Sequence, residues 1–108
     1  MDLKLNHLET LLFEDCVKIN SLSSQMRQYV EELGEALVAL AKYQRALEWG
    51  TPEEIEQTLK DWKAEMADVL IMNLQMAHIF GMNEVLAIVH RKLDRQQERI
   101  NKKKQQHV

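Results

Sequence analysis

The chain contains few of the residues that break helices or cross-link a fold. Its 108 residues include one proline, three glycines and one cysteine. So few helix breakers favour long helices. The single cysteine, Cys16, excludes an internal disulfide and is typical of a reducing compartment. We therefore expect a cytoplasmic, helical protein.

The sequence also lacks a long apolar run. The longest apolar-rich segment, residues 66–80, is shorter than the roughly 20 residues that a membrane span requires, and it contains Asp68, Asn73 and Gln75. Hydrophobic residues make up 45% and charged residues 29%, which is typical of a soluble folded domain. The length predicts a single domain over residues 1–108. The absence of a long apolar run predicts that this domain does not bind membranes.

The net charge of −3 is unevenly distributed. Residues 84–104 hold seven basic and three acidic side chains, whereas the remainder holds seven basic and fourteen acidic ones. An acidic body with a basic final segment suggests a ligand that bridges carboxylates and cations, such as a polyphosphate with its metal. The acidic body argues against nucleic-acid binding through the basic segment.

Apolar spacing predicts four helices, over residues 3–20, 24–48, 52–80 and 84–104. Their connections are short, which predicts an all-α fold, an antiparallel four-helix bundle. Residues 102–108 form a polar tail that we expect to fray. Two heavily apolar helices in so small a domain imply more apolar surface than one bundle buries. We therefore expect a homo-oligomer, a dimer or a dimer of dimers.

Local signals mark the expected helix ends. Thr51 and Pro52, with Glu54 three residues after the threonine, predict an N-cap, a first helical residue and a capping box. The other expected caps and stops, in chain order, are Ser23 or Ser24, Gly50, Gly81 and Asn83.

The second predicted helix has two different sides. At about 100° per residue, one arc forms an expected core face of Met26, Tyr29, Val30, Leu33, Leu37, Leu40 and Leu47. Glu31, Glu32 and Glu35 lie on the opposite side, which becomes apolar further along the helix at Ala39 and Tyr43. A helix with apolar residues on both sides is usually covered on both. We therefore expect the carboxylates to face a crevice.

Acidic side chains recur one helical turn apart in two of the predicted helices. Glu31, Glu32 and Glu35 form like-charged neighbours on one helix, as Glu65 and Asp68 do on the next. Alone, each group is more typical of a solvated acidic surface. Together they offer the oxygen ligands that Mg²⁺ prefers, and Glu65 and Asp68 enter an apolar helix where uncompensated charge is costly. The pairing predicts a magnesium site.

The motifs Glu31-Glu32-x-x-Glu35 and, about thirty residues later, Glu65-x-x-Asp68 resemble those of the all-α nucleoside triphosphate pyrophosphohydrolases of the MazG-like superfamily. The resemblance covers nearly the whole chain and includes Lys92-Leu93-Asp94-Arg95 in the last helix. It implies hydrolysis of the α–β bond of a (d)NTP to (d)NMP and pyrophosphate. It also implies that Glu32, Glu35, Glu65 and Asp68 bind Mg²⁺, for which Mn²⁺ could substitute, and that Glu31 assists, through a second metal or the attacking water. Gln96 and Gln97 depart from the Arg or Asn of many relatives.

Further side chains have both a functional and a structural interpretation. Lys92 and Arg95 would clamp phosphates, or belong to a solvated basic face. Met72, Met76 and Asn73 would line a nucleoside pocket, or serve core packing. A di-iron carboxylate protein is disfavoured because no histidine follows a glutamate by three residues. The alternative to an enzyme is a non-catalytic helical oligomerisation or binding module with an acidic surface.

Overall fold

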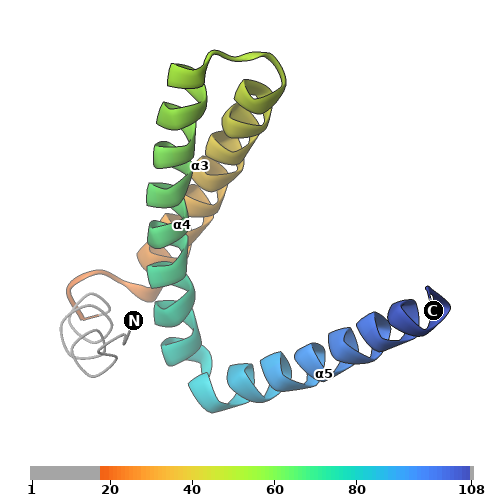
Figure 1. Ribbon diagram of the computed structural model, residues 1–108. Coiled ribbons are helices and arrows are strands. Elements are labelled where there is room, and N and C mark those ends of the chain that lie inside the picture. The colour runs from red at the N-terminus through yellow and green to blue at the C-terminus, as the bar shows by residue number, and fades with distance from the viewer. Residues whose placement is uncertain (1–17, 108) are drawn as a thin grey trace.

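The computed structural model describes residues 18–107. They contain three helices, α3 (Leu22–Trp49), α4 (Pro52–Phe80) and α5 (Met82–Gln106), and no strand. The prediction of an all-α chain is confirmed for this part of the sequence. The helix predicted for residues 3–20 lies almost entirely outside the described residues. Helices α3 and α4 form an antiparallel hairpin, and α5 leaves its end in a different direction (Figure 1).

Helix α3 begins earlier than predicted. Its N-cap is Ser21, whose Oγ accepts a hydrogen bond from the backbone N–H of Ser24 at 3.1 Å. The predicted caps Ser23 and Ser24 are therefore wrong, since both lie inside the first turn. All three serines are reasonable caps by residue type, and the extended backbone of Ser21 (φ −63°, ψ 156°) decides among them.

The start of α4 agrees with the prediction. Thr51 Oγ1 accepts a hydrogen bond from the Glu54 backbone N–H at 3.2 Å, and its hydroxyl donates to Glu54 Oε1 at 3.3 Å. Pro52 occupies the first turn, where its missing N–H costs nothing. Gly50 ends α3, as predicted, with its N–H bonded to the Ala46 carbonyl. Two residues thus separate α3 from α4, enough for a tight antiparallel turn.

The junction between α4 and α5 is shorter. Gly81 ends α4, as predicted, in a conformation with φ +119° that favours glycine. Helix α5 begins at the next residue, so the predicted cap Asn83 is wrong and lies within the first turn. The polar segment from residue 102 does not fray at once, because α5 continues to Gln106.

Helices α3 and α4 pack along a seam whose residues recur three and four apart. On α3 these less exposed residues are Gln25, Tyr29, Glu32, Ala36, Ala39, Tyr43 and Ala46. On α4 they are Ile55, Thr58, Trp62, Glu65, Val69, Met72, Met76 and Ile79. A 3–4 spacing keeps one face of each helix toward its partner. Gln75 on α4 also donates a buried hydrogen bond to Gln25 on α3.

The predicted core face of α3 was wrong in all but Tyr29. The other members of that arc are exposed by between 39% and 71% (Met26, Val30, Leu33, Leu37, Leu40 and Leu47). Buried alanines lie toward α4 instead, at positions 36, 39 and 46. Small side chains let two helices approach closely. The leucine-rich arc is therefore left without a partner among the described residues.

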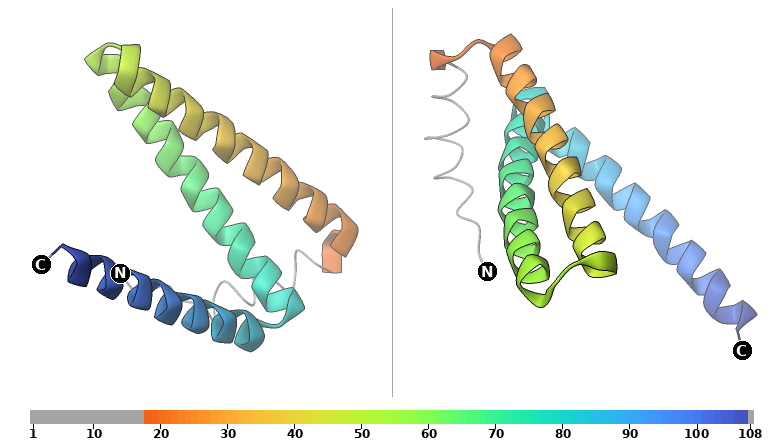
Figure 2. Two further views of the ribbon diagram at one scale, coloured as in Figure 1. Left: turned by 90° about the vertical axis from the view of Figure 1, so that its right-hand side faces the viewer. Right: turned by 90° about the horizontal axis from the view of Figure 1, so that it is seen from above.

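Helix α5 stands apart from the hairpin. It contains no buried residue and approaches only α4 among the described elements. Both further views show it diverging from the paired helices (Figure 2). The Cα radius of gyration is 18.0 Å, against about 13 Å for a compact chain of this length. A four-helix bundle is not seen within the described part of the chain.

None of the described helices is both long enough and apolar enough to span a membrane.

The assignment of Ser21 as the cap can be tested by substitution. We expect Ser21→Ala to lower the free energy of unfolding by about 1 kcal/mol, because an N–H of the first turn loses its acceptor. Ser24→Ala, within the same turn, should change it by less than about 0.5 kcal/mol. Urea unfolding at one fixed protein concentration measures both. Equal effects of the two substitutions would contradict the assignment.

Candidate functional site

Two carboxylates lie in the seam between α3 and α4. Glu32 and Glu65 occupy seam positions on α3 and α4, and both side chains are partly buried. Their positions follow from the 3–4 spacing, because Glu32 lies one turn before Ala36 and Glu65 one turn before Val69. The seam that brings the helices together therefore brings two negative charges together.

Asp68 completes a cluster of three carboxylates. One side-chain oxygen from each of Glu32, Glu65 and Asp68 lies within 4.8 Å of the others. Asp68 is exposed, so the cluster is open to solvent on one side. Glu32 Oε1 accepts a hydrogen bond from Gln28 Nε2 at 2.8 Å. Glu32 Oε2 and Glu65 Oε2 are buried and have no hydrogen-bond partner among the described residues.

The cluster disfavours the ionised form of Glu65. Burial of the carboxyl group raises its pKa above the ordinary value, and the negative charges of Glu35, Asp68, Glu32 and Asp61 raise it further. A partly buried carboxylate among like charges is stabilised by a bound proton or a nearby cation. The cluster therefore favours either protonation of Glu65 or binding of a cation.

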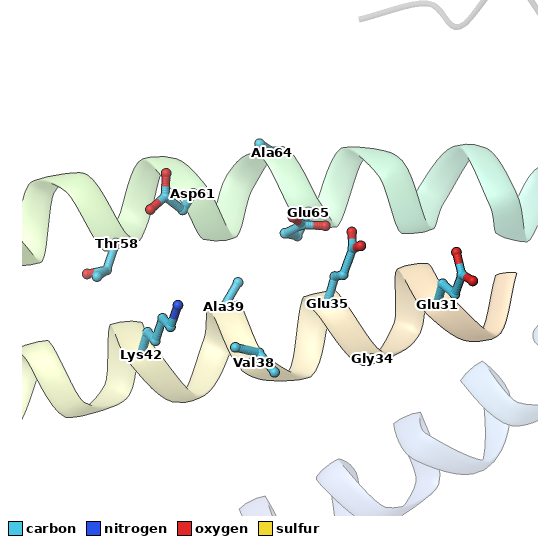
Figure 3. A pocket seen from close by; sticks show the side chains of 10 residues that line it. All are labelled: Glu31, Gly34, Glu35, Val38, Ala39, Lys42, Thr58, Asp61, Ala64 and Glu65. Carbon is cyan, nitrogen blue, oxygen red and sulfur yellow. The ribbon is translucent and has the colours of Figure 1, made fainter. Parts of the chain in front are cut away.

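A groove of about 740 Å³ runs between α3 and α4 beside the cluster. Glu31, Glu35 and Glu65 line one end of it, and their carboxylates point toward the gap between the helices (Figure 3). The other lining residues are Gly34, Val38, Ala39, Lys42, Thr58, Asp61 and Ala64. Glu31 and Glu35 are exposed, whereas Glu65 is partly buried. All of the acidic residues predicted for the site therefore lie in the cluster or the groove.

Sequence reasoning missed three polar groove residues, Lys42, Thr58 and Asp61. Lys42 and Thr58 lie toward the other end of the groove, with Asp61 between them and Glu65 (Figure 3). Helical spacing contained the signal, because Lys42 follows Glu35 by seven residues, two turns along one face. Lys42 puts a positive charge at the opposite end from Glu31.

The predicted phosphate ligands are not close to the carboxylates in this chain. Lys92 and Arg95 are exposed on α5, and the groove is lined by α3 and α4 residues alone. Helix α5 does not approach α3 within the described residues. The single chain therefore does not bring the predicted cations to the acidic site.

The predicted nucleoside-pocket residues are dispersed. Met72 is buried in the seam, where it packs between α3 and α4, and Met76 is half-buried one turn further along. Asn73 is exposed, and its side-chain oxygen accepts a hydrogen bond from the Tyr29 hydroxyl. None of the three lines the groove. The burial of Met72 agrees with the alternative interpretation, in which this side chain packs in the core.

The donor set suits a hard divalent cation. Carboxylate oxygens are the ligands that Mg²⁺ and Mn²⁺ accept, and Mg²⁺ keeps several waters while taking one or two carboxylates. Glu32 Oε2 and Glu65 Oε2 are buried, and no donor from residues 18–107 satisfies them, which is the observation that fits a cation. The exposed Asp68 leaves room for water and ligand.

No protein-family model matches the chain, and neither a curated protein nor a solved structure is significantly similar to it.

The raised pKa of Glu65 makes a prediction about stability in the absence of divalent cations. The folded chain holds the Glu65 proton more tightly than the unfolded chain, so the folded state loses stability as the pH rises above the unfolded pKa of about 4.3. Glu65→Gln removes this titration. We expect the variant to gain stability relative to the wild type between pH 4 and pH 7 in EDTA, as measured by urea unfolding.

Glu56→Gln, on the exposed surface of α4, controls for the loss of a carboxylate outside the cluster. A difference between Glu65→Gln and the wild type that does not change with pH would contradict the coupling within the cluster.

Proposed function

We propose that the chain is a Mg²⁺-dependent nucleoside triphosphate pyrophosphohydrolase that acts on the nucleotide pool in the cytoplasm. The observation that supports it is the cluster of three carboxylates from two helices beside the acidic groove, with two buried oxygens that have no hydrogen-bond partner among the described residues. The resemblance of these residues to the MazG-like motifs adds the reaction: cleavage of the α–β bond to (d)NMP and pyrophosphate.

Glu32, Glu65 and Asp68 would hold the metal ion, with Glu35 as a further ligand from the groove. When bound, Mg²⁺ neutralises phosphate charge and lowers the pKa of a coordinated water. The Glu32 and Glu65 side chains are positioned by the seam and Glu32 also by Gln28, so little reorganisation is needed to present their oxygens.

Hydrolysis adds water across the α–β phosphoanhydride and releases a proton. Glu31, exposed at the acidic end of the groove, is positioned to accept that proton, and Glu35 is the second candidate. Lys42, about two helical turns beyond Glu35, provides a cation for the outer phosphates. The groove volume of about 740 Å³ is within the range of small-molecule sites.

Lys92 and Arg95 lie outside the groove, since α5 does not line it, so Lys42 is the cation that this proposal assigns to the phosphates. We propose that the chain is a homo-oligomer in which a four-helix arrangement is completed between copies. Hydrolysis requires the carboxylates and the groove, both of which belong to one α3–α4 hairpin.

A second candidate, a non-catalytic oligomerisation module, is favoured by one observation: the large apolar side chains exposed on α3 and α5. An oligomerisation module gives no function to Glu32 Oε2 and Glu65 Oε2, the buried oxygens without a hydrogen-bond partner among the described residues. Turnover decides between the two functions.

A panel of NTPs and dNTPs with Mg²⁺ tests the activity. We expect at least one triphosphate to yield monophosphate and pyrophosphate, rather than diphosphate and orthophosphate. Glu35→Gln and Asp68→Asn should each lower kcat/KM by about 100-fold or more, which corresponds to at least about 2.7 kcal/mol of transition-state stabilisation. Glu56→Gln, outside the cluster and the groove, should retain activity. Absence of turnover with every triphosphate would reject the enzyme in favour of the module.

Metal binding is tested separately from turnover. At about ten times its dissociation constant, Mg²⁺ should raise the free energy of unfolding by about 1.4 kcal/mol, because it binds the folded state alone. Glu65→Gln should abolish this gain, and Glu56→Gln should keep it. Urea unfolding with and without MgCl₂, together with calorimetric titration of the metal, measures the effect. An equal gain in both variants would place the metal elsewhere.

A further inference from the structure

Helix α5 exposes an apolar stripe over most of its length. The stripe comprises Val85, Leu86, Val89, Leu93 and Ile100, each exposed by between 36% and 60%. At about 100° per residue these positions fall within one arc of the helix. A helix that buries nothing has little to stabilise it in water, because most helix stability in proteins comes from packing of the apolar face.

The short junction prevents α5 from covering this stripe with its own hairpin. Gly81 is the single residue between α4 and α5, whereas Gly50 and Thr51 separate α3 from α4. Antiparallel helix pairs need connections of about two to five residues. With one residue, α5 is directed away from the hairpin, as both figures of the whole chain show (Figures 1 and 2). Within the described residues, therefore, nothing covers the α5 stripe.

The chain itself offers a matching surface. The α3 stripe, which we define as Met26, Val30, Leu33, Leu37 and Leu40, is exposed by between 39% and 71%. It extends about 21 Å along α3, and the α5 stripe extends about 22 Å, at 1.5 Å per residue. The α3 stripe contains no charged residue, and by helical angle it lies on the side of α3 away from Glu31 and Glu35.

The charges of the two surfaces are complementary. Helices α3 and α4 together carry ten acidic and five basic side chains, whereas α5 carries three acidic and seven basic ones. Two hairpins meeting face to face would bring net negative charge against net negative charge. A hairpin that meets α5 brings opposite net charges together, which favours association.

The exposed area is sufficient for a stable contact. The chain exposes 8887 Å², against about 6,200 Å² for a compact protein of this size. The excess of about 2,700 Å² per chain is more than the ~800 Å² that each partner buries in a standard interface.

We propose that two copies of the chain exchange their α5 helices, so that the α5 stripe of each copy packs on the α3 stripe of the other. The exchange is reciprocal and closes after two copies, as a two-fold symmetric dimer does. It holds whether or not the chain hydrolyses nucleotides, and it leaves the groove between α3 and α4 open, since the α3 stripe lies on the other side.

Matched aspartate substitutions in α5 test the exchange. Leu93 lies in the stripe, and Ala87 lies about 120° from it around the helix. Both are exposed in the single chain, so either substitution should leave the helix intact. Sedimentation equilibrium should find a wild-type dimer at micromolar concentration. Leu93→Asp should raise its dissociation constant by about 100-fold, and Ala87→Asp, with the same change of charge, by less than about threefold. A monomeric wild type, or equal effects of the two variants, would overturn the proposal.

A disulfide between copies identifies the contact. In a Cys16→Ser background, copies with Leu93→Cys are mixed with differently tagged copies that carry Leu33→Cys, Leu37→Cys or Leu40→Cys. Disulfides between the two tags should form with at least one partner, and more readily than with Ala87→Cys. Cross-linking no better than that of Ala87→Cys would show that the dimer uses another surface, and would also reject the exchange.

Discussion

The close approach of α3 and α4 along a seam of alanines is the interaction on which the rest of the structure depends. Ala36, Ala39 and Ala46 remove the bulk that would hold the helices apart. The same seam carries Glu32 and Glu65, so tight packing also forces carboxylates together. The helices gain contact area and incur electrostatic repulsion at the same place. A cation or a proton resolves that conflict, and this links the fold to its proposed chemistry.

The hairpin also divides α3 into sides with different functions. One side packs on α4, one presents Glu31, Glu35 and Lys42 to the groove, and one exposes the α3 stripe. Because each of these three sides has a different role, few residues of α3 can be substituted without affecting the packing, the groove or the α3 stripe. Within the described residues α3 is covered only on the side that meets α4, and the α3 stripe is exposed, so the expectation that both apolar sides are covered stays a prediction.

Much of the local structure was predictable from sequence, because its causes are local. Thr51, Pro52 and Glu54 specify the start of α4 through bonds within one turn, and Gly50 and Gly81 end helices as expected. The acidic residues were found for the same reason, since one-turn spacing places them on shared faces.

The packing face of α3 was not predictable in this way. Its leucine arc is the more hydrophobic, but the shape of the alanine seam decides which side meets α4. The position of α5 depends on the length of one connection, and a pattern of apolar residues contains no information about direction.

The single-residue junction at Gly81 also has a consequence for how such a protein could change over time. Insertion of only a few residues there would let α5 fold back along its own hairpin, and the exchanged contact would become a contact within one chain. Deletion would reverse the change. In a chain of this design, the choice between a self-sufficient subunit and an obligate pair would depend on the length of a loop rather than on the surfaces that meet.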